Sequence, residues 1–233
     1  MRETQWRRLG GVAGLLFVVL TLITVFIPFT TPAADVPTSE IVTVIVDDRT
    51  SLLTFGYLLG LGAAVFMVFT AALYSLLRRG EGNAGGPSVI VLAGGIGTSL
   101  ILVVSQAVLA ATIYAANRDA EPEAIRALFE LSTPLYTSSA LMLTVFLAGT
   151  AFSLIPSRVL PRWLGWTAAA LAIAFFISLL SIFSSAEGGG FLGVFFFLGE
   201  LGLFVWILTT SINMLLRARG IPRPPATPEA TAG

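Results

Sequence analysis

The sequence predicts an all-α protein, a polytopic transmembrane bundle of six helices with both termini in the cytoplasm. Six apolar runs, each long enough to cross a bilayer, fill most of the 233 residues. Most of the positive charge lies in alternate gaps between these runs, and three of the four tryptophans lie at the same ends of the runs. Together, these observations place the chain in a membrane and give it a direction.

Each apolar run is about 20 residues or more, the length that crosses a hydrocarbon core about 30 Å thick. Because the bilayer interior offers backbone amides no hydrogen-bond partner, runs too few to close a barrel must be α-helices. The longer runs must tilt or project beyond the lipid. The predicted spans lie, in chain order, near 9–29, 51–77, 88–115, 134–154, 163–183 and 190–216.

Arginine sets the orientation, because cytoplasmic loops close to the membrane carry an excess of positive charge. Ten of the 13 arginines lie before the first run, in the gaps at 78–87 and 155–162, and after the last run. The opposite gaps hold only Arg49, Arg118 and Arg126, with nine of the 13 acidic residues. We therefore expect a multi-pass protein of the cell (plasma) membrane.

The gaps differ in length, and this predicts how the helices pair. The short gaps at 78–87 and 155–162 should make antiparallel neighbours of the second and third spans, and of the fourth and fifth. The longer gaps at 30–50 and 116–133 have room for short surface helices, which we expect at 38–49 and 121–130. The segment 220–233 is rich in proline and has few apolar residues, so we expect a disordered cytoplasmic tail.

Small residues at a spacing of four predict contacts between helices, since they let two backbones approach closely. Gly10 and Gly14 in the first span, and Gly56 and Gly60 in the second, have this spacing. We expect these four glycines to face neighbouring helices rather than lipid.

Glu200 is the one ionisable residue deep within a predicted span, roughly 15 Å along its helix from Gly190. No arginine lies within a span to pair with it, so we expect a protonated carboxyl at neutral pH. Counting the same depth along other helices predicts Gln106 and Thr144 as its partners, with Ser105 beside them. Two roles stay open: a functional intramembrane site, or a hydrogen bond that only holds helices together.

The residues that are missing exclude several kinds of chemistry. The chain has no His, no Cys and no Lys, so a His-ligated haem, the usual zinc sites, a Ser-His triad and Schiff-base catalysis are excluded. We expect no metal site, no cofactor and no nucleic-acid partner. The expected surroundings are the lipid bilayer, with a small molecule or a lipid as a conceivable ligand.

Four segments carry a resemblance to a known family. They are Arg8-Leu-Gly-Gly-Val-Ala-Gly-Leu-Leu-Phe17, Asp47-Asp-Arg-Thr-Ser-Leu-Leu53, Ala72-Leu-Tyr-Ser-Leu-Leu-Arg-Arg79 and Leu160-Pro-Arg-Trp-Leu-Gly-Trp166. In this order they resemble an uncharacterised family of six-span bacterial integral membrane proteins, a domain of unknown function, over residues 5–217. The resemblance implies a fold and a location, but no substrate, cofactor or catalytic residue.

Two functional readings follow. In the first, the bundle is not an enzyme and handles a small molecule, a proton or a lipid at Glu200, or supports other membrane proteins. In the second, it is a lipid-active membrane enzyme that uses outer carboxylates such as Asp48 or Glu130. The sequence favours the first reading, because Glu200 has no acidic companion at its depth and carboxylate catalysis usually needs two facing groups. It does not give the oligomeric state.

Overall fold

The computed structural model describes residues 3–30, 36–82, 86–118, 120–157, 159–180 and 190–219. Within these ranges the chain forms helices and no strand, so the predicted all-α class is confirmed. All the helices except α2 are long and apolar enough to cross a membrane. The helices are α1 (Glu3–Val25), α2 (Thr38–Asp47), α3 (Arg49–Gly80), α4 (Pro87–Ala116), α5 (Pro122–Ser157), α6 (Arg162–Leu179) and α7 (Gly190–Arg219).

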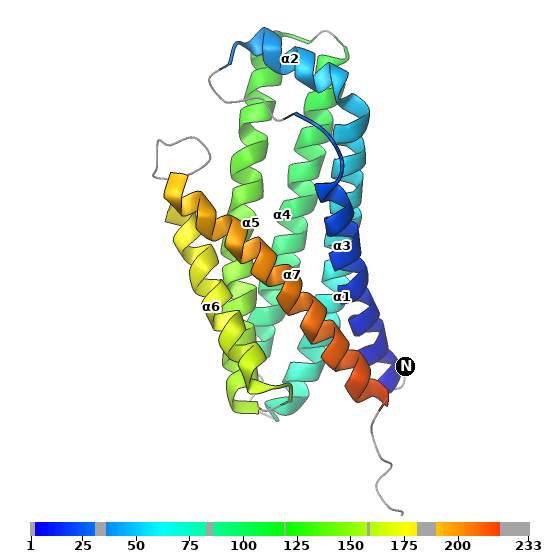
Figure 1. The fold of residues 1–233 in the computed structure, drawn as a ribbon, viewed down its shortest axis with the longest axis vertical. Coiled ribbons are helices and arrows are strands. Elements are labelled where there is room, and N and C mark those ends of the chain that lie inside the picture. The colour runs from blue at the N-terminus through cyan, green and yellow to red at the C-terminus, as the bar shows by residue number, and fades with distance from the viewer. Residues whose placement is uncertain are drawn as a thin grey trace, which may run out of the picture.

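The six long helices form a ring in which each packs against the next and α7 packs against α1 (Figure 1). The pairs α3–α4 and α5–α6 are antiparallel neighbours, as the short connections predicted. Helix α7 runs obliquely across the bundle, from beside the end of α6 to the start of α1. Helix α1 begins and α7 ends at the same end of the bundle, which we call the termini end. The opposite end, where α2 lies, is the cap end.

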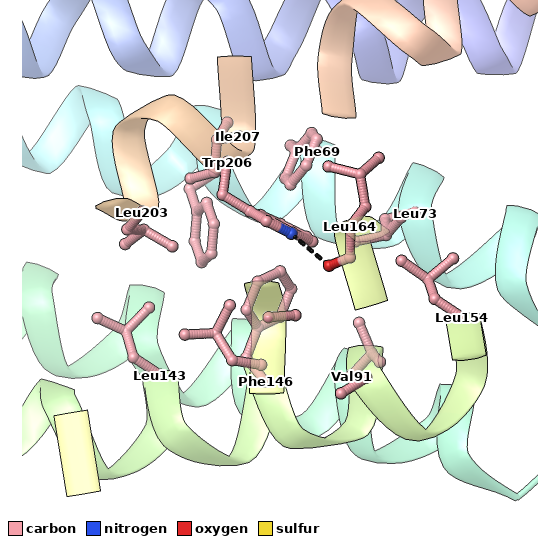
Figure 2. Packing of buried hydrophobic residues seen from close by; sticks show 14 of the residues in the cluster. Phe69, Leu73, Val91, Leu143, Phe146, Leu154, Leu164, Leu203, Trp206 and Ile207 are labelled. Atoms are coloured by element: carbon pink, nitrogen blue, oxygen red, sulfur yellow. Dashed lines mark hydrogen bonds between the residues drawn. The ribbon is translucent and has the colours of Figure 1, made fainter. Parts of the chain in front are cut away.

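Apolar side chains, several of them aromatic, fill the centre of the ring (Figure 2). The Phe66 ring lies 5.1 Å from that of Phe17 and 5.2 Å from that of Phe146, and the Phe146 ring lies 6.1 Å from the Trp206 ring. These rings come from α1, α3, α5 and α7. Each distance is in the range at which tilted or edge-to-face aromatic pairs attract.

Glycines allow close approach at several points of the ring. A Cβ on Gly10 would overlap the Ala72 side chain of α3, and a Cβ on Gly14 would overlap the Ser211 hydroxyl of α7. At Gly94 of α4, which the spacing did not single out, a Cβ would lie 2.7 Å from the Cα atom of Phe146 on α5. These three glycines therefore lie where helices touch.

The glycine pair of α3 gives a different result. A Cβ on Gly56 would lie 3.1 Å from Oε1 of Gln106, a tight contact with the end of a side chain. A Cβ on Gly60 would have no atom of a neighbouring helix within 4 Å, so the structure gives no close helix contact there. A spacing of four places two glycines on one face of a helix, but it does not say that a neighbour follows that face along both turns.

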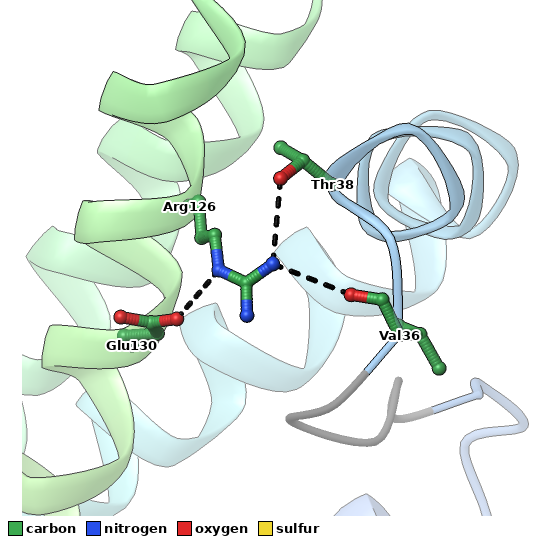
Figure 3. A network of polar contacts seen from close by, with 4 residues as sticks. All are labelled: Val36, Thr38, Arg126 and Glu130. Carbon is green, nitrogen blue, oxygen red and sulfur yellow. Dashed lines mark hydrogen bonds and ion pairs between the residues drawn. The ribbon is translucent and has the colours of Figure 1, made fainter.

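The cap end has a small hydrophobic core of its own. Helix α2, predicted within 38–49, turns Ile41 and Ile45 inward against α3, α4 and α5. The carboxylate of Asp48, between α2 and α3, accepts a hydrogen bond of 2.7 Å from the Thr30 amide. Arg126 of α5 donates to the Val36 carbonyl and the Thr38 hydroxyl at 3.4 Å each (Figure 3). These bonds tie the segment before α2 to α5.

The predicted separate helix at 121–130 is wrong, because these residues form the first turns of α5. Pro122 suits the first turn of a helix, where its missing N–H costs nothing. Pro134, where the sequence placed the start of a span, lies inside the same helix. A proline there removes one backbone hydrogen bond without ending a long helix that tertiary packing holds. The end of the predicted 163–183 span and the 220–233 tail lie outside the described residues.

Candidate functional site

The one polar contact of Glu200 that the structure records is made with a residue that depth counting missed. The hydroxyl of Tyr136 on α5 donates a hydrogen bond of 2.6 Å to Oε1 of Glu200 on α7. The Tyr136 ring packs edge-on against Phe196, with 5.8 Å between ring centroids. Because Phe196 and Glu200 are four residues apart, they share a face of α7. One face of α7 therefore both packs against the phenol ring and accepts the hydrogen bond of its hydroxyl.

This pair lies in the wall of a cavity of about 40 Å³ inside the helix ring. A water-sized molecule needs about 10 to 15 Å³ by this measure, so the cavity has room for a few such molecules and for no organic substrate. The lining is contributed by α1, α3, α4, α5 and α7. It consists of Phe17, Thr21, Leu59, Phe66, Thr98, Leu102, Tyr136, Ser139, Leu143, Glu200, Leu203 and Phe204.

Two threonine hydroxyls in the lining already donate hydrogen bonds to backbone carbonyls. Thr21 donates to the carbonyl of Phe17, and Thr98 donates to the carbonyl of Gly94, each at 2.9 Å. A hydroxyl has one proton and two lone pairs, so each of these oxygens can only accept a further hydrogen bond. The Tyr136 oxygen can likewise only accept a further hydrogen bond, because its hydroxyl donates to Glu200. These three oxygens therefore remain as acceptors in a wall that is otherwise mainly apolar.

Buried aromatic side chains lie next to the cavity, further along α3 and α7 toward the termini end. Phe66 follows Leu59 along α3, and Trp206 follows Glu200 along α7, and both helices run toward that end. The Phe66, Phe146 and Trp206 side chains are at most 2% exposed.

The predicted layer of Glu200, Gln106, Thr144 and Ser105 does not form. Thr144 donates to the carbonyl of Ala140 in its own helix at 2.8 Å, and Ser105 donates to the carbonyl of Ser132 at 3.4 Å. Gln106 lines a separate groove of about 270 Å³ between α3 and α4. Its Oε1 atom is buried and has no hydrogen-bond partner within the described residues.

The depth count failed because the helices do not begin at the same height. Helix α5 begins at the cap end, so Tyr136, 14 residues after Pro122, lies about 21 Å along it. Helix α7 begins well below the cap end (Figure 1), so Glu200 reaches the same level after about 15 Å. The sequence does contain a signal: Arg126 and Glu130 have the i,i+4 spacing of a helical ion pair, and joining the expected helix at 121–130 to the next apolar run would have moved the start of the count.

The two outer carboxylates proposed for lipid chemistry have structural partners. Asp48 accepts the Thr30 amide, and Glu130 pairs with Nε of Arg126 at 2.7 Å. In the part of the chain that the structure describes, no three His, Cys, Asp or Glu side chains come together in a group that could hold a metal ion. Asp48 therefore ties the chain after α1 to the start of α3, whereas Glu130 pairs within its own helix.

Comparisons with models of known protein families, with curated proteins and with solved structures found no match. A function for this chain therefore has to be argued from the Tyr136–Glu200 cavity and the bundle around it.

Proposed function

We propose that the chain is a multi-pass protein of the bacterial plasma membrane, with its six long helices across the bilayer and both termini in the cytoplasm. The apolar length of the helices supports insertion. The orientation is supported by the arginines that begin or end helices at the termini end, among them Arg78, Arg79, Arg162 and Arg217. The resemblance to uncharacterised six-span bacterial membrane proteins supports the location.

The function that the site supports best is non-enzymatic: the bundle takes up and releases a proton at Glu200. The observation that carries this proposal is the Tyr136–Glu200 hydrogen bond in the wall of a water-sized cavity. An ionisable group within a membrane-spanning segment is costly, and such groups are commonly found where protons or ions are handled. The cavity is too small for an organic substrate, so the species handled is a proton or is of about the size of water.

Infrared spectroscopy of the purified protein tests whether Glu200 exchanges a proton. We expect a carboxyl C=O band that changes with pH in the wild type and is absent from Glu200→Gln. Glutamine can still accept the Tyr136 hydroxyl but cannot titrate, so the melting temperature should be kept. Tyr136→Phe should move the band, because the hydrogen bond to the carboxyl is lost. Thr144→Val, whose hydroxyl bonds its own helix, should leave the band in place.

Proton flux connects this chemistry to a membrane function. Protein reconstituted in liposomes that contain a pH-sensitive dye should pass protons down an imposed gradient, and Glu200→Gln should abolish this flux while Thr144→Val keeps it. A structural role for Glu200 predicts the opposite, namely equal flux in wild type and Glu200→Gln. Such a result, or a carboxyl band that does not respond to pH, would refute the proposal.

A further inference from the structure

A groove lies between α6 and α7 on the outside of the bundle. The second half of α6 touches the first half of α7, where a Cβ on Gly199 would lie 3.2 Å from the Phe175 ring and a Cβ on Gly202 would lie 2.5 Å from the Leu171 side chain. From there the two helices separate toward the termini end (Figure 1). The space between them is a groove of about 400 Å³, which we call the α6–α7 groove. Its lining includes Trp163, Thr167 and Ala170 of α6 and Leu201, Val205 and Trp206 of α7.

The α6–α7 groove offers a ligand mainly apolar contacts. No charged side chain is among its lining residues. Its two threonine hydroxyls donate within their own helices, Thr167 to the Trp163 carbonyl at 3.0 Å and Thr209 to the Val205 carbonyl at 2.6 Å. The indole N–H of Trp206 donates to the carbonyl of Leu164. A polar molecule would lose hydrogen bonds to water here without replacing them, whereas a hydrocarbon chain has none to lose.

The length of the groove matches the hydrocarbon of one bilayer leaflet. Trp163 and Leu171, at its two ends on α6, are eight residues apart, which is about 12 Å along a helix. One leaflet contributes about 15 Å of hydrocarbon, half of a core about 30 Å thick. The groove opens outward, since Trp163 is 51% exposed and Val205 is 63% exposed. In a bilayer, an acyl chain of the leaflet at the termini end would therefore lie along it.

Positive charge lies where the groove reaches the termini end. Arg162, the first residue of α6, precedes Trp163 and is exposed, and no hydrogen bond or ion pair of its side chain is recorded among the described residues. Arg217 donates to the carbonyl of Val159, three residues before Arg162, which brings a second guanidinium to the same connection. Glu81, at this end of the bundle, already accepts hydrogen bonds of 2.8 and 2.5 Å from serines of α4 and α5. The Arg162 side chain is therefore available to an anion.

We propose that the α6–α7 groove binds one anionic phospholipid of the leaflet at the termini end, with an acyl chain along the groove and the phosphate beside Arg162. A guanidinium binds phosphate through charge-assisted hydrogen bonds, and basic sites between transmembrane helices on the cytoplasmic side bind acidic headgroups. Trp163, between the two, has the amphipathic ring that suits the membrane boundary. This inference goes beyond proton exchange at Glu200. It rests on the proposed membrane insertion and orientation of the chain.

Quenching of tryptophan fluorescence by lipids with brominated acyl chains tests the proposal, because bromine quenches only on contact. The Trp6→Phe/Trp166→Phe protein keeps Trp163 and Trp206, the two tryptophans of the groove. It is reconstituted in phosphatidylcholine vesicles with a rising fraction of brominated phosphatidylglycerol or brominated phosphatidylcholine. We expect half-quenching at about a fivefold lower fraction of the anionic lipid, the preference that one basic residue gives. The Trp6→Phe/Trp163→Phe protein keeps Trp166, which is 64% exposed and outside the groove, and should show no such preference.

Substitutions show whether the lipid occupies this groove. Arg162→Gln should remove the preference for the anionic lipid, whereas Arg8→Gln, at another exposed arginine of the termini end, should keep it. Ala170→Phe fills the groove and should reduce quenching by both lipids. Ala107→Phe, in the separate groove between α3 and α4, should leave quenching unchanged.

Melting of the wild-type protein in detergent gives a measure that needs no tryptophan variant. A lipid that binds only the folded protein stabilises it, so phosphatidylglycerol should raise the melting temperature more than phosphatidylcholine does. Arg162→Gln should remove this difference. Equal effects of the two lipids, or a preference that Arg162→Gln keeps, would overturn the proposal. Loss of quenching by both lipids in a dimeric protein would also overturn it, because a second copy would then cover the groove.

The two proposals fail in different ways. If both brominated lipids quench the groove tryptophans equally while Glu200→Gln abolishes proton flux, the lipid inference is wrong and proton exchange stands. If the groove selects the anionic lipid but wild type and Glu200→Gln pass protons equally, proton exchange is wrong and the lipid site stands. Brominated lipid is present in both leaflets of the vesicles, so the quenching result does not depend on the orientation of the protein.

Discussion

The indole N–H of Trp206 on α7 donates a hydrogen bond of 2.9 Å to the carbonyl of Leu164 in the first turn of α6 (Figure 2). Six residues earlier on α7, Glu200 accepts the Tyr136 hydroxyl of α5. Helix α7 is therefore held to two other helices by side-chain hydrogen bonds, in addition to apolar packing. Two such ties fix how far the helix can slide along its axis, and so fix the level of Glu200.

The first prediction concerns the Trp206 tie. Trp206→Phe removes the bond to Leu164 and part of a side chain that is 2% exposed. We expect a loss of about 1 to 2 kcal/mol in the free energy of unfolding, from the lost bond and the reduced packing. Unfolding in detergent measures it. Trp166→Phe is the matched control, since Trp166 is 64% exposed and should change stability very little; equal losses in both variants would contradict the assigned role.

The second prediction concerns the close approach of α4 and α5. Gly94→Ala places a methyl group against the Phe146 backbone, which cannot move aside as a side chain can, so it should cost about 1 to 3 kcal/mol. Gly60→Ala adds the same methyl group where nothing lies within 4 Å. It should be neutral or stabilising by up to about 1 kcal/mol, because alanine favours helix over glycine. Melting temperatures in the reverse order would show that the α4–α5 contact is looser than described.

A third prediction separates local from global stability at the cap end. Arg126→Ala removes the bonds to Val36 and Thr38, and it should speed hydrogen exchange in α2. Because these bonds are partly exposed, the free energy of global unfolding should fall by less than about 1 kcal/mol. Glu130→Gln breaks the ion pair but leaves the bonds toward α2, so exchange in α2 should stay at the wild-type rate. Faster exchange in both variants would mean that the ion pair, and not the bonds toward α2, holds the cap.

The fourth prediction tests the proposed orientation. The chain has no cysteine, so single cysteines can be introduced without interference. Ala120→Cys at the cap end should react with a membrane-impermeant maleimide in intact cells, whereas Arg162→Cys at the termini end should react only after permeabilisation. The reversed pattern would show that the cap end faces the cytoplasm.

The sequence predicted the fold well because hydrophobic length is a local property. About 20 apolar residues indicate a helix whatever surrounds them, and short gaps leave adjacent helices little choice of partner. The start of α5 was placed late because Pro134 resembles a helix start when only its local preference is considered. The packing of α5 against α4 and α6, which keeps the helix continuous there, is a tertiary property.

The site was predicted only in part, for a similar reason. Glu200 was identified because an acid in an apolar run stands out in the sequence. Its partner Tyr136 was not, because pairing across helices depends on the tilt of α7 and on the height at which it begins. The hydropathy of a single run determines neither the tilt of a helix nor the height at which it begins. Counting the same number of residues from the ends of two helices gives the same depth only if the helices are parallel and begin at the same height.

The ring order of the helices has a consequence for biosynthesis. Each of the helices α3 to α6 can dock against a neighbour that has already been made, but α7 closes the ring between α6 and α1. Until it arrives, Gly14 of α1 lacks the Ser211 contact, and the cavity lacks the wall that carries Glu200. A nascent chain that stops before Gly190 therefore has five of its long helices but lacks Glu200. The proposed proton site is therefore complete only when α7 has been made and has joined the ring.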